Sequence, residues 1–452
     1  MFNKDALIQK DKAHLLHPAT SIADHQKNTP RIVTSAETVY IEDINGDKQL
    51  DAVGGLWCVN VGYGRKELAD CMQTAAQQLA YYHSFSGASN PSEIQLASRL
   101  IKLTEGRMSK VFFGSSGSDA NDTLIKIAWQ YFHLKGQPQK RKIIARQQAY
   151  HGTSISTASL TGIESFHKGF GLPLPEVIRV SCPHFWRFAK PSQTEVEYTD
   201  QLIEEIDKTI QLNGAENIAA FIAEPIIAAG GVIPPPVDYF QKLKACLERY
   251  DILLICDEVV CGFGRLGHTF GADYYHIEAD MMATAKGLTS GYFPLSAAFI
   301  NDKIWQVLLS HADQMGNFAH GYTYSGHPVG CAVAMANLDI IERDQLIDYA
   351  AVQGAYLHQQ LARLLNLPAV AEIRGVGLLA GIQLVSDKQQ KTLCNPADQI
   401  PAKIAAACFK QGLIVRPLPS VSSLALSPPF TIVAEQIDFI VDTLEKAISS
   451  VT

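Results

Sequence analysis

Two apolar runs each end near a charged residue that could do chemistry. The run 251–257 closes on Asp257, and the run 279–287 carries Lys286 close to its end. Each run predicts a buried strand with its charged residue at the carboxyl edge, where open α/β sheets bind ligands. Pyridoxal phosphate needs these two side chains, a lysine for the Schiff base and a carboxylate to keep the pyridine nitrogen protonated. On these runs alone, an inter-strand salt bridge is the alternative.

A loop of small residues, Gly114–Ser118, lies between a predicted strand at 111–113 and a predicted helix at 118–134. Backbone N–H groups at a helix N-terminus attract anions, and the Ser116 and Ser118 hydroxyls add donors for a phosphate. An ordinary helix cap at Ser118 is the alternative. The loop matches neither a Walker loop nor a dinucleotide fingerprint.

Tyr150-His151-Gly152 follows the next predicted strand, 142–146. An aromatic ring at that sheet edge can lie over a pyridine ring. Taken without the other elements, Tyr150 is better interpreted as a core aromatic.

Size and composition exclude several classes of protein. The chain has 452 residues, 47% hydrophobic and 18% charged, which indicates a globular protein of two or three domains. A net charge of −7 argues against a nucleic-acid partner. No apolar stretch is long enough for a membrane span, and no signal-peptide core follows Met1, so cytoplasm is the expected location.

The nine cysteines form no CxxC pair, and no histidine spacing is of zinc type, so no metal site is expected. Four of the cysteines are predicted to be reduced core thiols: Cys58, Cys256, Cys261 and Cys331.

The order of predicted elements indicates an α/β fold. Between about 60 and 325, helices at 91–103, 118–134, 196–212 and 238–250 alternate with strands at 111–113, 142–146, 218–223, 251–257 and 279–287. This alternation predicts a mostly parallel sheet with helices on both faces. A hairpin at 38–51 precedes it, and a smaller α+β part follows 330. We expect an N-terminal arm at 1–55 that joins the small domain, a cofactor-binding large domain at 56–328 and a C-terminal small domain at 329–452.

Together these elements resemble the class III aminotransferases, which are fold-type I pyridoxal-phosphate enzymes. The resemblance runs in order from about 30 to 430 and is carried by Gly114–Asn121, Tyr150-His151-Gly152, Glu224-Pro225, Asp257-Glu258-Val259, Lys286-Gly287 and His320–Pro328. Within the class, the chain looks most like the amine:pyruvate (omega-) transaminases.

The resemblance implies a role for each matching residue. Lys286 holds the cofactor and carries the proton, and Asp257 pairs with the pyridinium. Tyr150 stacks on the ring and Val259 packs on its other face. The phosphate is held by Ser116, Gly117 and Ser118, and by Thr323 of the neighbouring subunit, which implies a homodimer or a dimer of dimers. His151, Glu224 and Tyr322 complete the expected cofactor-binding set.

The same resemblance suggests the substrates, which are a small amine and a keto acid. Leu56, Trp57, Phe85 and Tyr150 are expected to line the donor pocket. Arg416, at the end of a predicted strand 412–416, would clamp the keto-acid carboxylate.

Ala229 stands where 4-aminobutyrate and ornithine enzymes carry a glutamate that pairs with this arginine. We therefore expect a primary amine or diamine donor with pyruvate. The alternative is an ω-amino-acid enzyme that uses 2-oxoglutarate. A decarboxylase or aminomutase, a binding protein that retains the fold, and a phosphate-binding dehydrogenase are further alternatives.

Overall fold

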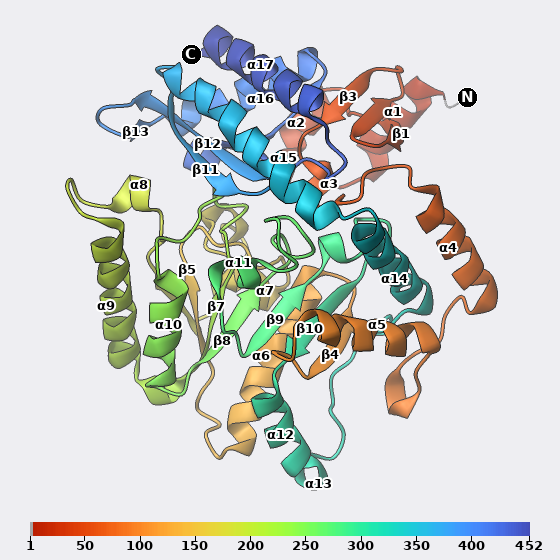
Figure 1. Ribbon diagram of the computed structural model, residues 1–452, viewed down its shortest axis with the longest axis vertical. Helices are drawn as coiled ribbons and strands as arrows, with labels where there is room; N and C mark the ends of the chain where they lie inside the picture. Colours follow the sequence, from red (N-terminus) through yellow and green to blue (C-terminus); the bar gives the residue numbers. More distant parts are fainter. Residues whose placement is uncertain (1–2) are drawn as a thin grey trace.

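A seven-stranded sheet occupies the middle of the computed structural model, which describes residues 3–452 (Figure 1). Its order is β4 (Lys110–Gly114), β10 (Ser296–Ile300), β9 (Met281–Thr284), β8 (Leu253–Asp257), β7 (Ile218–Ala223), β5 (Lys142–Arg146) and β6 (Val177–Val180). The strands from β9 to β6 are parallel, and β10 is antiparallel to both of its neighbours. The mostly parallel α/β sheet expected from the sequence is confirmed.

Side chains of β8 alternate between two apolar clusters, one on each face of the sheet. Leu253 and Ile255 join the cluster under α6 (Gly117–Leu134), whereas Leu254 and Cys256 join the cluster of α9 (Glu195–Asn213) and α10 (Tyr239–Glu248). A strand buried on both faces can be apolar throughout, which is why the run 251–257 reads as continuous.

Two smaller sheets lie beside the large one. An antiparallel sheet contains β11 (Val370–Val376), β12 (Leu379–Asp387), β13 (Thr392–Leu393), β15 (Arg416–Leu418) and β16 (Ser423–Leu426). It packs with α15 (Leu346–Leu361), α16 (Ile400–Lys410) and α17 (Ala434–Val451), as Figure 1 shows at the top. A four-stranded sheet joins β1 (Val33–Glu37), β2 (Tyr40–Asp43) and β3 (Lys48–Asp51) to β14 (Leu413–Ile414).

The N-terminal hairpin thus lies next to a strand from the C-terminal part of the chain, with Leu413 opposite Leu50 in parallel register. This pairing supports assigning the arm to the small domain, although the expected boundaries at 55 and 328 stay a prediction.

Most of the remaining helices are short or lie at the periphery, whereas α14 (Pro328–Arg343) is long and largely buried. The others are α1 (Lys4–His14), α2 (Ile22–Lys27), α3 (Gly54–Trp57), α4 (Lys66–Gln78), α5 (Pro91–Leu103), α7 (Ile155–Leu160), α8 (Phe185–Phe188), α11 (Gly271–Tyr275), α12 (Asp302–Ser310) and α13 (Ala312–Met315). Within residues 3–452, no helix combines the length and apolarity that crossing a membrane requires.

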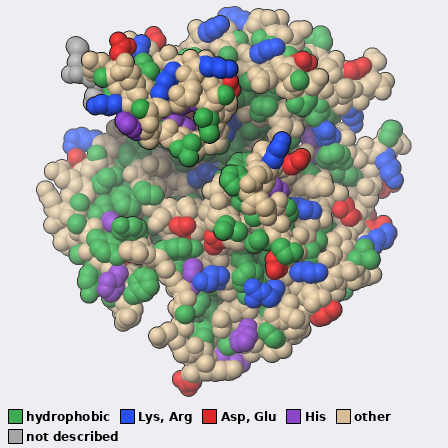
Figure 2. Space-filling view, turned by 180° about the vertical axis from the view of Figure 1, so that it is seen from behind, with side chains coloured by type: hydrophobic (Ala, Val, Ile, Leu, Met, Phe, Trp, Pro, Cys, Tyr) green, Lys and Arg blue, Asp and Glu red, His purple; other side chains and the backbone are tan. Residues whose placement is uncertain are grey.

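All nine cysteines are free, and all but Cys58 and Cys71 are buried. Seen from behind, the surface is hollowed between an upper lobe and the lower body (Figure 2).

Two local expectations were wrong. The strand expected at 279–287 covers only β9, and Lys286 begins a 3-10 turn with a left-handed backbone, φ +46°. Arg416 does not end a strand but begins β15. The reason is that the chain leaves the four-stranded sheet after Ile414 and enters the antiparallel sheet at Arg416, so one apolar run serves two sheets.

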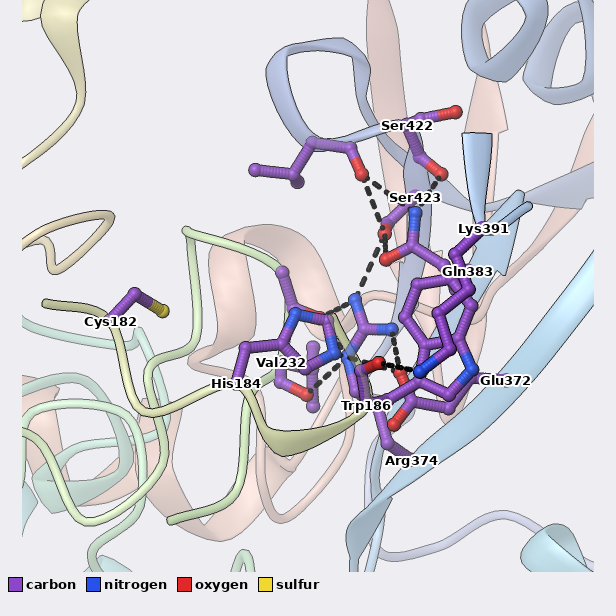
Figure 3. Close-up of polar contacts among 12 residues, drawn as sticks. Cys182, His184, Trp186, Val232, Glu372, Arg374, Gln383, Lys391, Ser422 and Ser423 are labelled. Atoms are coloured by element: carbon purple, nitrogen blue, oxygen red, sulfur yellow. Dashed lines mark hydrogen bonds and ion pairs between the residues drawn. The ribbon is translucent and has the colours of Figure 1, made fainter. Parts of the chain in front are cut away.

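A buried arginine joins the antiparallel sheet to the loop that follows β7. Arg374 Nε donates to the carbonyl oxygens of Gly231 at 2.9 Å and Val232 at 3.0 Å, and its Nη1 donates to Glu372 Oε2 at 2.8 Å. Glu372 also lies 2.9 Å from His184 Nε2 (Figure 3). Because these partners come from both parts of the chain, the network fixes the small sheet against the large one.

Replacement of Arg374 by methionine should lower the free energy of unfolding by about 3–5 kcal/mol, since it leaves the Glu372 carboxylate and the loop carbonyls without their buried cation. Urea unfolding followed by circular dichroism measures the change. Arg363→Met is the matched control, because Arg363 pairs with Asp442 and Glu445 at the surface and its loss should change stability little. Equal losses in both variants would contradict the role of the buried network.

Candidate active site

The Asp257 carboxylate is buried at the carboxyl end of β8 and is held there by three polar contacts. Its Oδ2 accepts a hydrogen bond from Asn121 Nδ2 at 2.8 Å and lies 2.8 Å from His151 Nδ1. Its Oδ1 accepts from the Val259 N–H at 3.1 Å. Only 3% of the residue is exposed, so these donors stabilise a charge that water does not reach.

Lys286 lies at the same edge, in the turn that follows the neighbouring strand β9. Its Nζ is 6.0 Å from the centroid of the Trp57 ring. Burial lowers the pKa of Lys286, and the negative charges of Asp257 and Glu224 oppose part of that shift. A lowered pKa increases the neutral fraction of the amine, which is the form that attacks a carbonyl carbon.

The glycine-serine loop forms a close-packed cradle at the N-terminus of α6. Ser116 caps the helix by accepting from the Asp119 N–H at 3.2 Å, so the helix begins two residues earlier than a cap at Ser118 would give. A side chain at Gly117 would place its Cβ 2.9 Å from Val259 Cγ2. Ser118 Oγ accepts from the Thr153 N–H at 3.1 Å. The close approach of Val259 to Gly117 explains why the residue after the cap is glycine.

These residues fit a phosphorylated pyridine aldehyde such as pyridoxal phosphate. The N-terminus of α6 supplies N–H groups for a phosphate, and the cradle leaves no room for a side chain at Gly117. Lys286 can bond covalently to an aldehyde, and buried Asp257 can pair with a pyridinium. His151 Nε2 and Asn121 Oδ1 are buried beside Asp257 and have no hydrogen-bond partner among the described residues.

Glu224 positions the backbone around Tyr150. Its Oε1 accepts from the Tyr150 N–H at 3.0 Å, and its Oε2 accepts from the Ala228 N–H at 2.9 Å. Both carboxylate oxygens are therefore bound to the protein itself, and a direct cofactor contact of Glu224 stays a prediction. Burial and the charges of Asp257 and Glu224 raise the pKa of the Tyr150 hydroxyl, whereas the Arg416 guanidinium opposes this shift.

Phe85 lies in the segment 81–90 and Thr323 in the segment 322–326, and hydrogen bonds join these two distant segments into one unit. Asn90 Nδ2 donates to the Gly326 carbonyl at 2.9 Å, and Tyr81 Oη donates to the Thr323 carbonyl at 2.7 Å. Thr323 is exposed, and within residues 3–452 its hydroxyl makes no hydrogen bond. Tyr322 Oη, in contrast, donates to the Asp119 carbonyl in α6 at 3.1 Å. The unit therefore abuts the cradle while presenting Thr323 outward.

Of the expected substrate residues, Trp57 belongs to the segment 53–57, and Ala229 and Arg416 lie beside this segment. Trp57, only 6% exposed, and half-buried Ala229 pack in one apolar cluster. Arg416 is exposed and lines a cavity of about 580 Å³ together with Val53 and Gly55. Leu56 and Phe85 are 58% and 45% exposed, so a single pocket that contains both stays a prediction. A second cavity, of about 410 Å³, contains none of the expected site residues.

Asn121 was missed as an individual residue. It lies within the Gly114–Asn121 element, but only the fold reveals that its amide joins Asp257 to the His151 carbonyl, at 2.8 and 2.9 Å. The available signal was a polar residue on the apolar face of the predicted helix. Buried Glu258 was also left without a role. It accepts from the Gly271 and Ala272 N–H groups, and burial raises its pKa to about 7.

Comparisons with known proteins bear on this site. Residues 21–448 match the aminotransferase class III family. A diaminobutyrate–2-oxoglutarate transaminase of Halomonas elongata is 39% identical and aligns over 99% of this chain and 96% of its own length. The structure of an omega transaminase from Pseudomonas jessenii in complex with PMP is 38% identical, with a TM-score of 0.96 over 99% of this chain and 98% of that one.

A further structure is that of a thermostable omega transaminase engineered for asymmetric synthesis of enantiopure bulky amines. The variant is substituted at a tryptophan, a phenylalanine and an arginine. It is 37% identical, with a TM-score of 0.96 over 98% of this chain and 99% of that one. Since the family match covers nearly the whole chain and the fold agrees over the same length, the chain belongs to the class III aminotransferases, which are pyridoxal-phosphate-dependent transaminases.

Proposed function

We propose that this transaminase moves the amino group of a primary amine or diamine to pyruvate. The observation that carries the proposal is the environment of Arg416. Among residues 3–452, no ion pair joins its guanidinium to a carboxylate, and by the resemblance Ala229 stands where 4-aminobutyrate and ornithine enzymes carry the glutamate that pairs with this arginine. An exposed guanidinium can bind the carboxylate of a keto acid and can swing aside on its flexible stem when an amine without a carboxylate occupies the site.

The alternative is an ω-amino-acid transaminase that uses 2-oxoglutarate. It is supported by the diaminobutyrate–2-oxoglutarate transaminase that is 39% identical to this chain. Both functions need the same lysine and carboxylate, so only the acceptor and the amine separate them.

Within the proposal, Lys286 anchors the cofactor and then carries the proton of the substrate carbon. The bound cofactor supplies an electron sink for the electron pair that this proton leaves behind. Asp257 would pair with the pyridine nitrogen, because Asn121, His151 and the Val259 N–H hold its carboxylate in place. Tyr150 and Val259 would bracket the ring, and Ser116, Gly117 and Ser118 would hold its phosphate.

We further propose a homodimer in which Thr323 completes the phosphate site of the other subunit. The exposure of Thr323 on a unit that abuts the cradle supports this arrangement. A cytoplasmic location stays a prediction from the sequence.

The donor pocket is proposed to contain Trp57 and Phe85, with Leu56 and Tyr150 beside them. The engineered omega transaminase supports this choice, because it was altered at a tryptophan, a phenylalanine and an arginine for asymmetric synthesis of enantiopure bulky amines. Trp57, Phe85 and Arg416 are the same three residue types.

Arg416→Ala should separate the two half-reactions. The reaction of the amino form of the enzyme with pyruvate should slow roughly 10–100-fold, because a charged hydrogen-bond pair to the carboxylate is lost. The reaction of the aldehyde form with a simple amine should be nearly unchanged. Single-turnover absorbance changes measure both rates. Arg31→Ala removes another guanidinium from the same cavity and serves as the control. An equal loss in both half-reactions would contradict the proposed movement of Arg416 between keto acid and amine. A wild-type preference for 2-oxoglutarate would contradict the assignment of pyruvate as the acceptor.

Uptake of cofactor by apoenzyme should report the pKa of Lys286. The neutral amine is the reactive form, so the rate rises with pH and levels off below the ordinary lysine pKa of 10.5. Asp257→Asn removes the charge that raises this pKa, and the midpoint should therefore move to lower pH. Stopped-flow absorbance after mixing apoenzyme with pyridoxal phosphate measures the profile.

Two variants check that this profile belongs to Lys286. Lys286→Ala should abolish the uptake step. Lys140→Arg should leave the profile unchanged, although burial lowers the pKa of Lys140 to about 8. If the profile follows Lys140, or if Lys286→Ala turns over repeatedly near the wild-type rate, the assignment of Lys286 is wrong.

Thr323→Ala should weaken cofactor retention by about 1.5–3 kcal/mol, the range for a hydrogen bond to a charged group. Equilibrium dialysis against pyridoxal phosphate measures it, and light scattering establishes that the variant is still a dimer. Thr153→Ala is the control, because the Thr153 backbone, rather than its hydroxyl, contacts Ser118. Unchanged affinity in a dimeric Thr323→Ala protein would count against the shared site.

A further inference from the structure

The N-terminal arm begins with a helical hairpin that lacks a core of its own. Neither α1 nor the six-residue α2 contains a buried residue. Lys12 Nζ donates to the Gln26 carbonyl at 2.8 Å, and Gln26 Nε2 donates back to the Lys12 carbonyl at 3.0 Å. Isolated helices this short are marginal in water, so polar contacts must hold the hairpin together.

Beside this pair, two imidazoles converge on one carboxylate. His17 Nε2 lies 3.0 Å from Asp11 Oδ2, and His25 Nε2 lies 2.8 Å from Asp11 Oδ1. The His25 and Asp11 side chains are only 11% and 14% exposed. The three residues come from α1, the connecting loop and α2, so the cluster ties the two helices across the loop.

Hydrogen bonding alone leaves this cluster incomplete. His25 Nε2 is buried 2.8 Å from Asp11 Oδ1 but forms no hydrogen bond with the described residues. The two rings are tilted by 45° with centroids 4.3 Å apart, so they are not stacked either. Both Nε2 atoms therefore approach the same carboxylate, and His25 does so without a hydrogen bond.

We propose that Asp11, His17 and His25 bind a divalent transition-metal ion of the Zn²⁺ class, which staples α1 to α2. Two imidazole nitrogens and one carboxylate oxygen form a common zinc ligand set, whereas Ca²⁺ and Mg²⁺ prefer oxygen ligands. The ligand atoms all lie within 4.8 Å of one another. Ligand atoms around a tetrahedral Zn²⁺ with bonds of about 2.0–2.1 Å lie closer than that, so small side-chain movements suffice. A water molecule can take the fourth position.

This site was not expected from the sequence, because Asp11, His17 and His25 match none of the usual ligand spacings. It requires neither the cofactor nor any residue of the proposed active site. A metal staple also explains how a hairpin without a buried residue keeps a defined shape.

Binding is tested on the full-length holoenzyme after removal of any affinity tag and treatment with a chelator. Titration with Co²⁺ should give the visible bands of nitrogen and oxygen ligation, without the thiolate-to-cobalt charge-transfer band that cysteine ligation would produce. One equivalent of Zn²⁺ per chain should displace the Co²⁺. Equilibrium dialysis with elemental analysis gives the stoichiometry independently of enzyme activity.

His17→Ala and His25→Ala should each weaken metal binding by at least the roughly 10–100-fold that loss of an outer-shell partner costs. His14→Ala is the matched control, because His14 is an exposed histidine in the last turn of α1 and is outside the cluster. Zn²⁺ should also slow proteolysis of the segment 3–28 in wild type and His14→Ala, but not in His25→Ala. The proposal is overturned if wild type binds no stoichiometric metal, or if His17→Ala and His25→Ala bind it as tightly as wild type.

Discussion

The buried carboxylate of Asp257 constrains much of the surrounding structure. A carboxylate removed from water is costly unless donors surround it, and three donors from different segments do so here. The Asn121 amide can reach Asp257 only if α6 packs against the sheet. His151 reaches it from the turn after β5, and the Val259 N–H reaches it because the chain bends just past β8. Because all three must meet at one sheet edge, the cradle at the start of α6 is brought to the same place.

Elements set by local patterns were predictable from the sequence. The helix α5 begins at Pro91 after the cap Asn90, and β7 is an unbroken apolar run, so both have the expected bounds. Predictions failed where a neighbour decides the conformation. No local signal shows that the stretch 412–418 is divided between two sheets, and lysine does not by itself indicate the left-handed backbone of Lys286.

The residues of the candidate site likewise fall into those that the sequence predicted and those that it did not. A charged residue at the end of an apolar run is conspicuous, which is why Asp257 and Lys286 could be chosen from the sequence. Asn121 contacts Asp257 across 136 positions, and Arg374 contacts Gly231 across 143. Such contacts follow from topology, and a single sequence does not specify which distant segments meet. The ligands proposed for the metal, although close in sequence, need the turn between α1 and α2 to converge.

Two arginines of the antiparallel sheet differ in how freely their side chains can move. Arg374 is buried, bound to Glu372 and to the carbonyls of the loop after β7, so it cannot move without breaking several hydrogen bonds. Arg416, in β15 of the same sheet, is exposed and lies opposite Ala425 in β16. The fixed arginine holds the loop that contains Ala229 against this sheet. Under the proposed function, Ala229 offers Arg416 no carboxylate, so only the Arg416 side chain would have to move between a keto acid and an amine, and the two sheets would keep their relative position.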